Sequence, residues 1–406
     1  MTRPVSERAL LLLLAALTAI GPVSANLYLP ALPAVRDHFD ASVAEVQATF
    51  SISLLTFAFG MLFWGPWSDR YGRRPALLSG LAILLLGSIA CFIARDLGWL
   101  VAGRGILAFG TATGIIVARA IVSDLYPGQS MIKALATLTM VAVLGHALAP
   151  AVGGFLTAAL GWRSVFSALV LVAAVLALAV WRYLPETRAA IAEPPSAAEM
   201  LATAGRLLRM PLFAGCVAQT TIVFSTFLVF ISLAPYVMVS ALGRPSTEYG
   251  MYFVLIATGY FLGNWSVRRF MGSGGPHRMV ATGVVLQVVG TLAALGFALA
   301  GLLNPLWIFL PMSIVSFGQG LTLPNVTATA VSLAPEHAGV VSSTVGFLQQ
   351  LVGAFCVQLV GFFPTDTAVP MLTFCAGLCL AALGLLLVLP RVEPAGNHGA
   401  LEDRPA

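Results

Sequence analysis

The stretch Gly65-Pro66-Trp67-Ser68-Asp69-Arg70-Tyr71-Gly72-Arg73-Arg74 decides the fold of this chain. It places the charges of Asp69, Arg70, Arg73 and Arg74 between two long apolar runs. A membrane-spanning helix needs ~20 mostly apolar residues, and the runs on both sides of the stretch reach that length. We therefore expect the stretch to be a short loop between two membrane helices.

The rest of the chain has the composition of a membrane protein. Hydrophobic residues make up 59% of it, charged residues make up 9%, and the mean hydropathy is +0.94, which is unlike a soluble domain. The apolar segments long enough to span lie at 8–30, 46–66, 76–94, 99–122, 132–160, 163–184, 211–239, 249–267, 279–301, 305–333, 340–363 and 368–390. None of these segments contains Asp or Glu. We predict an all-α membrane protein with twelve transmembrane helices.

The twelve segments fall into two sets of six, separated by a polar stretch at 185–210. The second segment of each set ends similarly, with Gly-Pro-Trp-Ser-Asp-Arg at 65–70 and Gly-Asn-Trp-Ser-Val-Arg at 263–268. Such a repeat is typical of two pseudo-symmetric six-helix bundles with a substrate site between them. The predicted units are residues 1–184, a linker at 185–210, residues 211–390 and a cytoplasmic tail at 391–406.

Basic residues gather in the loops on one side of the predicted membrane. If the first segment enters from the inside, the inner side holds fifteen basic residues: Arg3, Arg8, Arg70, Arg73, Arg74, Lys133, Arg182, Arg188, Arg206, Arg209, Arg268, Arg269, Arg278, Arg391 and Arg404. The outer loops hold Arg36, Arg95, Arg163 and Arg244. Because Lys and Arg are enriched in cytoplasmic loops, both termini are expected in the cytoplasm. The net charge of +5 then reflects orientation and anionic lipids, and we expect no nucleic-acid partner.

The charged stretch resembles the Gly-x-x-x-Asp-Arg-x-Gly-Arg-Arg signature that follows the second span of major facilitator superfamily transporters. Further runs are similar to the Bcr/CflA subfamily of drug exporters: Asn-Leu-Tyr-Leu-Pro-Ala-Leu-Pro at 26–33, Ala-Arg-Ala-Ile-Val-Ser-Asp-Leu-Tyr-Pro at 118–127, Leu-Pro-Glu-Thr at 184–187 and Phe-Leu-Gln-Gln at 347–350. The resemblance covers about 8–390. It implies a monomer in a bacterial inner membrane that exports small amphiphilic drugs, amphenicol- or bicyclomycin-like, in exchange for protons.

The resemblance also implies an inner gate built from charged residues. In the superfamily an acid at the inner end of the fourth span forms a charge cluster with the loop signature. Here the corresponding gating residues are Asp69, Arg70, Arg73 and Asp124. Arg119 is expected to help anchor the same helix end.

Ionisable residues within the spans are the candidates for transport chemistry, because inserting one into a membrane costs ~3 kcal/mol. Arg104 matches a superfamily arginine that faces the central cavity and takes part in proton coupling or substrate binding. Alternatively, its long side chain extends to the outer membrane surface. His146 lies mid-membrane and either carries a proton near neutral pH or is a buried neutral side chain with one hydrogen bond.

The fifth segment resembles a motif associated with antiporters. Its matching residues are Gly145, Pro150, Gly153 and Gly154, while Ala149 stands where the motif has its second glycine. Small residues let helices approach closely, and the proline removes one backbone hydrogen bond. The motif favours exchange over uniport.

One position departs from the family pattern. The subfamily usually has an aspartate before the Tyr-Leu-Pro element of its first span, where this chain has Asn26. An amide cannot titrate. Three explanations are open: His146 carries the proton, Glu45 at the cavity mouth carries it, or transport is not proton-driven. In the last case the alternative function is a metabolite or nutrient permease of the same fold.

The predicted substrate pathway consists of aromatic and polar side chains near the middle of the spans. They are Asn26, Tyr28, Gln47, Phe50, Arg104, His146, Gln219, Tyr236 and Gln349. Such walls suit amphiphilic ligands and not a sugar phosphate or a dicarboxylate.

The spans hold none of the residue patterns of an enzyme or of a metal site. The five cysteines lie inside predicted spans, without the His or acidic ligands that metal sites use. An intramembrane enzyme would need a pair of acids, and a nucleotide-driven pump would need a phosphate-binding loop. We expect no metal, no cofactor and no enzymatic activity.

Overall fold

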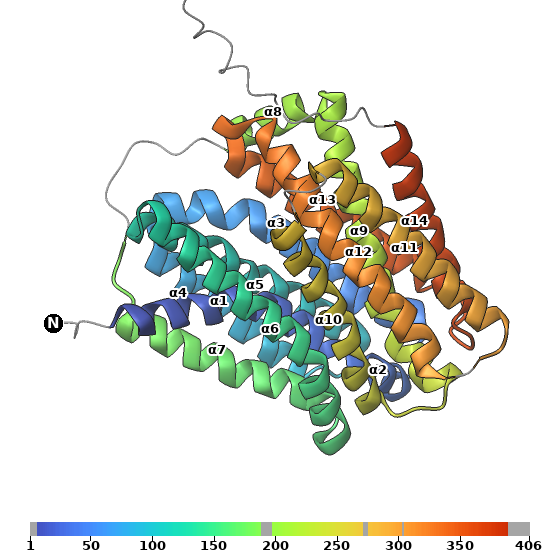
Figure 1. Cartoon of the computed structure of the whole chain (residues 1–406). Helices are drawn as coiled ribbons and strands as arrows, with labels where there is room; N and C mark the ends of the chain where they lie inside the picture. The colour runs from blue at the N-terminus through green and yellow to red at the C-terminus, as the bar shows by residue number, and fades with distance from the viewer. Residues whose placement is uncertain (1–5, 188–196, 271–274, 303, 389–406) are drawn as a thin grey trace, which may run out of the picture.

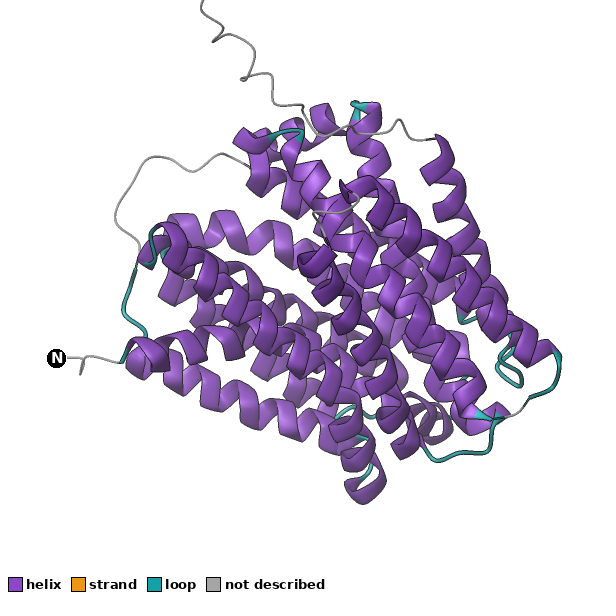
Figure 2. Ribbon diagram, viewed as in Figure 1, coloured by secondary structure: helices purple, strands orange, loops and turns teal. Residues whose placement is uncertain are grey.

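The computed structural model describes residues 6–187, 197–270, 275–302 and 304–388, and this part of the chain is helical throughout apart from turns (Figure 2). The predicted tail at 391–406 and part of the predicted linker, 188–196, lie outside the described residues. The helices of the first half are α1 (Glu7–Tyr28), η1 (Leu29–Ala31), α2 (Leu32–Phe39), α3 (Val43–Tyr71), α4 (Arg73–Phe92), α5 (Leu97–Leu125), α6 (Gly128–Leu160) and α7 (Arg163–Tyr183).

The second half follows a short linker helix, α8 (Ala197–Leu208). Its helices are α9 (Pro211–Tyr236), η2 (Val237–Ala241), α10 (Ser246–Phe270), α11 (Gly275–Leu299), α12 (Pro305–Ser332), η3 (Pro335–His337), α13 (Ala338–Val360) and α14 (Val369–Val388). The two halves lie side by side as two helical bundles (Figure 1).

Among the described residues, eleven helices are long and apolar enough to cross a membrane. The twelfth predicted span, 249–267, lies in α10, which has the necessary length but is less apolar. Tyr249, Tyr252, Tyr260 and Asn264 lower its hydropathy. It packs between α12 of its own half and α6 of the other half, so protein covers much of its surface.

The charged stretch at 65–74 is not a loop, which corrects the expectation from its charges. Helix α3 continues to Tyr71 despite Pro66, and α4 begins at Arg73. The whole connection is Gly72, whose φ of 101° lies in a region that glycine adopts without strain. The charged side chains therefore project from the ends of two rigid helices.

The halves meet at one end of the molecule, which we call the closed end; it contains η1, α2 and η2. Gln47 of α3 donates a hydrogen bond to the carbonyl oxygen of Ser232 in α9 at 3.0 Å. Gln358 of α13 donates to the carbonyl oxygen of Ala44 at 3.0 Å. Amide side chains thus tie the two halves together here.

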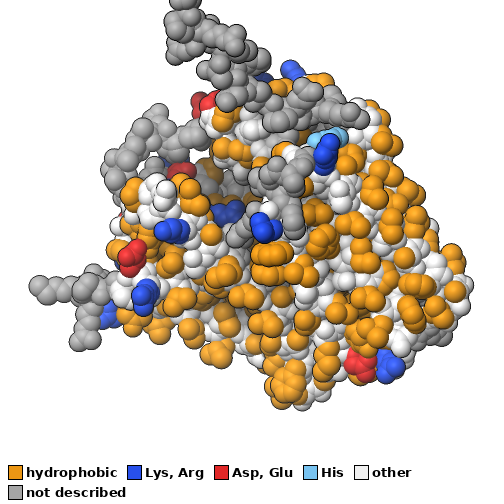
Figure 3. Space-filling model, viewed as in Figure 1, with side chains coloured by type: hydrophobic (Ala, Val, Ile, Leu, Met, Phe, Trp, Pro, Cys, Tyr) orange, Lys and Arg blue, Asp and Glu red, His pale blue; other side chains and the backbone are white. Residues whose placement is uncertain are grey.

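The opposite end, which contains the start of α1 and the linker helix α8, is called the open end. The helices of the two halves separate toward it (Figure 1). A space-filling view shows a hollow between the halves at this end, with basic side chains inside it (Figure 3). The structure is therefore closed at one end of the helices and open at the other.

Candidate functional site

Two adjoining cavities lie between the halves, one of about 280 Å³ and one of about 220 Å³. The larger cavity extends toward α3, α5 and α13, and the smaller cavity extends toward α10 and α12. Both are lined by Pro22, Ile115, His146, Phe224 and Phe227. The walls are mainly aliphatic and aromatic, so the few polar groups stand out, and His146 lies where the two cavities join.

His146 on α6 is hydrogen-bonded to Asn26 on α1. The distance between Asn26 Nδ2 and His146 Nδ1 is 3.0 Å, and the same Nδ2 lies 2.8 Å from the carbonyl oxygen of Pro22. A backbone carbonyl can only accept a hydrogen bond, so the end of the Asn26 amide that faces Pro22 must be the nitrogen and not the oxygen. This nitrogen then donates to both partners. His146 Nδ1 must therefore accept and carry no proton, and a neutral ring has its proton on Nε2.

The imidazole ring of His146 also contacts the second half of the protein. Its centroid lies 5.5 Å from that of Phe227 on α9 and 6.0 Å from that of Phe253 on α10. A change of charge on this ring would thus be felt by α1 of the first half and by two helices of the second.

Arg104 lies inside the protein against the larger cavity. It is 1% exposed, so its side chain does not extend to the outer surface, as the alternative interpretation required. Its guanidinium carbon lies 4.4 Å from the ring centroid of Tyr28. The hydroxyl group of Tyr28 is 2.9 Å from Oγ1 of Thr49, which holds that ring in place. Nε and Nη1 of Arg104 have no hydrogen-bond partner among the described residues.

The other predicted pathway residues divide into two groups. Asn26, Phe50 and Gln349 line the larger cavity with Arg104 and His146. Tyr28, Gln47, Gln219 and Tyr236 line neither cavity. Tyr28 supports Arg104 and Gln47 joins the halves, so these two act by positioning. Tyr236 is buried with the guanidinium carbon of Arg36 of the first half 6.0 Å from its ring centroid, and Gln219 is buried without a side-chain hydrogen bond among the described residues.

Neither cavity is lined by a carboxylate among the described residues. Glu45, one of the two residues predicted as possible proton carriers, caps the start of α3 at the closed end. Its Oε2 accepts hydrogen bonds from the backbone nitrogen of Ser42 at 2.8 Å and from its hydroxyl group at 2.7 Å. This capping box is a local helix-start structure, and it leaves Glu45 outside the cavities.

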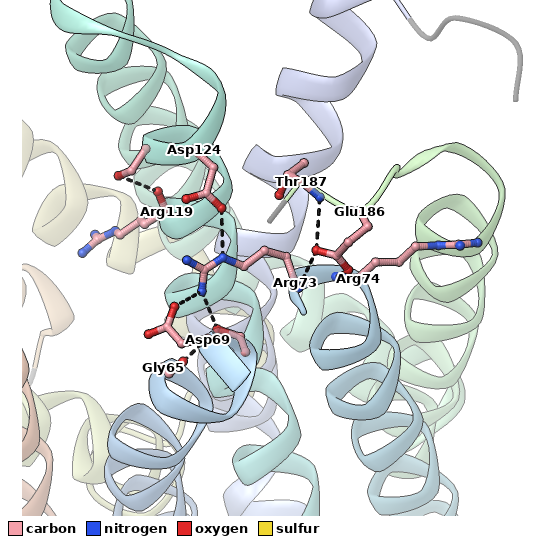
Figure 4. Close-up of polar contacts among 10 residues, drawn as sticks. Gly65, Asp69, Arg73, Arg74, Arg119, Asp124, Glu186 and Thr187 are labelled. Atoms are coloured by element: carbon pink, nitrogen blue, oxygen red, sulfur yellow. Dashed lines mark hydrogen bonds and ion pairs between the residues drawn. The ribbon is translucent and has the colours of Figure 1, made fainter. Parts of the chain in front are cut away.

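The predicted charge cluster exists at the open end, centred on Arg73 (Figure 4). Arg73 Nε donates to Asp124 Oδ2 at 3.0 Å, and Nη1 donates to Asp69 Oδ1 at 2.6 Å and to Ser68 Oγ at 2.8 Å. Because the guanidinium is planar with donors on several sides, one buried side chain links α3, α4 and α5. The cluster lies within the first half.

Two other predicted gating residues do not join this cluster. The side chain of Arg119 points away from it (Figure 4) and lines the smaller cavity, which His146 also lines. Arg70 is exposed, and its guanidinium lies over the ring of Tyr71 at 5.4 Å.

The sequence interpretation missed a structural role of Glu186. This residue follows α7, and its carboxylate accepts from the backbone nitrogens of Arg73 at 2.9 Å and Arg74 at 3.1 Å (Figure 4). A negative charge at these free N–H groups stabilises the start of α4. A Cβ on Gly72 would lie 2.6 Å from Glu186 Oε2, so the glycine also gives the carboxylate room. The run Leu-Pro-Glu-Thr was noticed in the sequence, but its partner on α4 was not predictable from it.

The antiporter-motif residues of α6 are packing residues on two sides. A Cβ at Gly145 would lie 2.8 Å from Val23 of α1, and one at Gly153 would overlap the carbonyl oxygen of Leu27 of α1. On the other side, Pro150 packs against Gly250 of α10, in the other half. Pro150, Gly153 and Gly154 are buried. The small residues thus let α6 approach its neighbours closely.

The fold has two helical bundles with cavities between them, and it is closed at one end and open at the other. This arrangement defines the class of membrane transporters that work by alternating access. Residues 14–357 match the Major Facilitator Superfamily, and the chain belongs to that family. It is a multi-pass membrane protein and a transporter, as predicted.

Named proteins with similar sequences align with nearly the whole chain. A bicyclomycin resistance protein homolog of Haemophilus influenzae is 28% identical over 91% of this chain and 93% of its own length. A chloramphenicol resistance protein of Pseudomonas aeruginosa is 27% identical over 97% of this chain and 93% of its own. A crystal structure of a D-xylose-proton symporter matches with a TM-score of 0.74 at 14% identity, covering 94% of this chain and 98% of that one, which shows the shared fold.

Proposed function

We propose that this protein exports small amphiphilic drugs, amphenicol- or bicyclomycin-like, across a bacterial inner membrane in exchange for protons. It acts as a monomer with both termini in the cytoplasm, and residues 1–184 and 211–390 rock about the central cavities, joined by the linker at 185–210, with a tail at 391–406. The names of the two resistance-protein relatives and the mainly apolar cavity walls support this assignment. With this orientation the open end faces the cytoplasm, so the described state is open to the inside.

The hydrogen bond between Asn26 and His146 is the observation that carries the proton-coupling part of the proposal. His146 is a titratable group at the junction of the cavities, where the described lining residues include no carboxylate. Since Asn26 donates to Nδ1, this bond exists only while Nδ1 is unprotonated. A proton that binds there places two donors face to face and breaks the bond.

Protonation of His146 would act on both halves at once. The bond to α1 would be lost, and the new positive charge would face the rings of Phe227 and Phe253, which attract cations. The charged groups that share a cavity lining with His146 are Arg119 in the smaller cavity and Arg104 in the larger one, and both would repel the imidazolium. A proton therefore stabilises one arrangement of the halves over the other, which is the requirement for coupling.

The charge cluster around Arg73 supplies the rigid part of this mechanism. It joins α3, α4 and α5 at the end that faces the cytoplasm, together with the cap that Glu186 places on α4. In the proposed cycle the first half moves as one body, and the cluster keeps its open-end helices together.

Drug-induced proton movement in everted vesicles tests the proposal. The vesicle lumen is made acidic and a pH-sensitive dye reports the loss of lumenal protons when chloramphenicol or bicyclomycin is added. We compare the unaltered protein with His146→Gln, which keeps an acceptor for Asn26 but cannot titrate. His38→Ala is the matched control, because His38 is an exposed histidine at the closed end, outside both cavities.

We expect drug-dependent proton release in the unaltered protein and in His38→Ala, and none in His146→Gln. Undiminished release by His146→Gln would refute the role of His146. If drugs move without protons in the unaltered protein and Asn26→Asp introduces proton release, the chain is a facilitator, the alternative that the missing aspartate raised. Uptake of radiolabelled drug into the same vesicles is measured in parallel, and its absence in every variant would refute drug export itself.

A further inference from the structure

Arg104 is a buried positive charge for which the described residues offer no counterion. Its side chain is 1% exposed, and no Asp or Glu forms an ion pair with it in the part of the chain that the structure describes. The face of the Tyr28 ring is its one described cation partner, at 4.4 Å. Two of its three nitrogens, Nε and Nη1, are buried without a hydrogen bond. Burying a charge with unmet donors is costly unless a partner arrives.

The surroundings of Arg104 identify what that partner must be. Arg104 lines the larger cavity, and all the charged or basic side chains that line the two cavities are cationic or can become so: Arg104, Arg119 and His146. No Asp or Glu is among the described lining residues, and the other titratable group is the phenol of Tyr260 in the smaller cavity. The cavity wall beside Arg104 is formed largely by Phe50, Phe57 and aliphatic side chains. The electrostatic field in this space therefore favours a negative group, and the walls favour an aromatic or aliphatic body.

Other orphaned polar atoms extend the pattern. Asn26 Oδ1 and Gln350 Oε1 belong to residues that line the same cavity, and neither atom has a described hydrogen-bond partner. Both are acceptors, so they suit a hydroxyl or N–H group elsewhere on the ligand. The larger cavity thus offers one place for a negative charge and two for donors.

We propose that Arg104 is the anion-binding group of the larger cavity and that the chain preferentially takes amphiphiles with one negative charge, such as a carboxylate, phenolate or sulfonate on an aromatic body. This substrate class deepens the proposed drug export and rests on it. The charge belongs beside Arg104 because charge-assisted hydrogen bonds are about twice as strong as neutral ones. Tyr28 positions the guanidinium and leaves the two free nitrogens for the ligand.

A pair of dyes with the same apolar body tests the proposal. 1-Anilinonaphthalene-8-sulfonate carries one sulfonate, and N-phenyl-1-naphthylamine lacks it; both fluoresce in apolar surroundings. Each dye is titrated into phosphatidylcholine nanodiscs that hold the full chain, with protein-free discs subtracted. The variants are Arg104→Gln, Arg104→Lys and the control Arg95→Gln, which removes an exposed arginine outside both cavities.

We expect Arg104→Gln to weaken binding of the sulfonate about 10- to 100-fold, as for the loss of a charge-assisted bond, and to change binding of the neutral dye less than about twofold. Arg104→Lys keeps a preference for the sulfonate, and Arg95→Gln changes neither dye. Equal losses for both dyes in Arg104→Gln would show a packing role and overturn the proposal. If Arg104→Gln does not fold, an Arg104→Lys variant without sulfonate preference overturns it instead.

The outcome is separable from that of the proposed function. The vesicle experiment uses chloramphenicol and bicyclomycin, which carry no negative charge, so proton release can succeed while the anion preference fails. A protein that binds the sulfonate through Arg104 but moves neither drug nor protons would refute export and retain the anion site.

Discussion

Replacing Gly250 with alanine should open the closed end of the protein. Gly250 on α10 lies against α6 of the other half, where an added Cβ would be 2.7 Å from the nitrogen of Ala151 and 2.8 Å from the carbonyl oxygen of Pro150. These neighbours are backbone atoms, which cannot rotate away as a flexible side chain would. The strain can be relieved only by moving α6 and α10, and hence the two halves, apart.

The size of the effect follows from these distances. Ordinary contacts of a Cβ begin at 3.4 Å, so the helices must separate by roughly 1 Å, and overpacking of this kind costs about 1 to 3 kcal/mol. The cost applies only while α6 and α10 are in contact, and the state in which the closed end opens avoids it. The equilibrium between the two states should therefore shift about 5- to 150-fold toward the latter.

Distances between spin labels at the closed end measure this shift. Labels at Arg95→Cys and Arg244→Cys, both exposed and one in each half, report the separation of the halves. Gly250→Ala should increase the population with long distances. Gly296→Ala is the matched control, because a Cβ there would meet no atom within 4 Å. Identical distance distributions in the unaltered protein and in Gly250→Ala would refute the argument that this contact holds the end closed.

Two further substitutions test the packing and the charge cluster. Arg73→Ala removes hydrogen bonds to two carboxylates and a hydroxyl group, and we expect it to destabilise the protein by about 1 to 3 kcal/mol. The thermal unfolding midpoint in detergent should fall by about 2 °C or more, whereas Arg70→Ala, at an exposed position, should change it little. Equal midpoints for these two variants would contradict the role of the cluster. Gly114→Ala would place a Cβ on the carbonyl oxygen of Leu17 and should destabilise the protein by a similar amount. Gly105→Ala is the control, because the atom nearest to its added Cβ would be 3.4 Å away. An unfolding midpoint of Gly114→Ala as high as that of Gly105→Ala would show that α1 and α5 can move apart without cost.

The transmembrane segments and the division into two halves were predictable from the sequence, because each span must be long and apolar to cross a membrane. That requirement acts on local composition and needs no knowledge of neighbours. α10 was predicted although it is less apolar than the other spans, since its length and position in the repeat compensate for its tyrosines and Asn264. Its contacts with α6 and α12 explain why that polarity is tolerated.

The candidate site was predictable only in part. Ionisable residues in a membrane are conspicuous, so Arg104 and His146 were found from the sequence and do line the larger cavity. Tyr236 and Gln219 were also predicted to line the substrate pathway, because they are aromatic or polar residues near the middle of a span, but they line neither cavity. The direction of a side chain depends on how its helix is rotated against its neighbours. Sequence position alone does not set that rotation.

The sequence by itself determined that the chain is a membrane transporter of two related halves, since composition, length and local motifs carry that information. The tertiary structure decided which polar groups meet. It paired Asn26 with His146 across 120 positions, left Arg104 without a counterion and brought Glu186 to the start of α4. These are relations between helices far apart in the chain, and they depend on how closely and at what rotation neighbouring helices pack, as the small residues of α6 show where they meet α1 and α10.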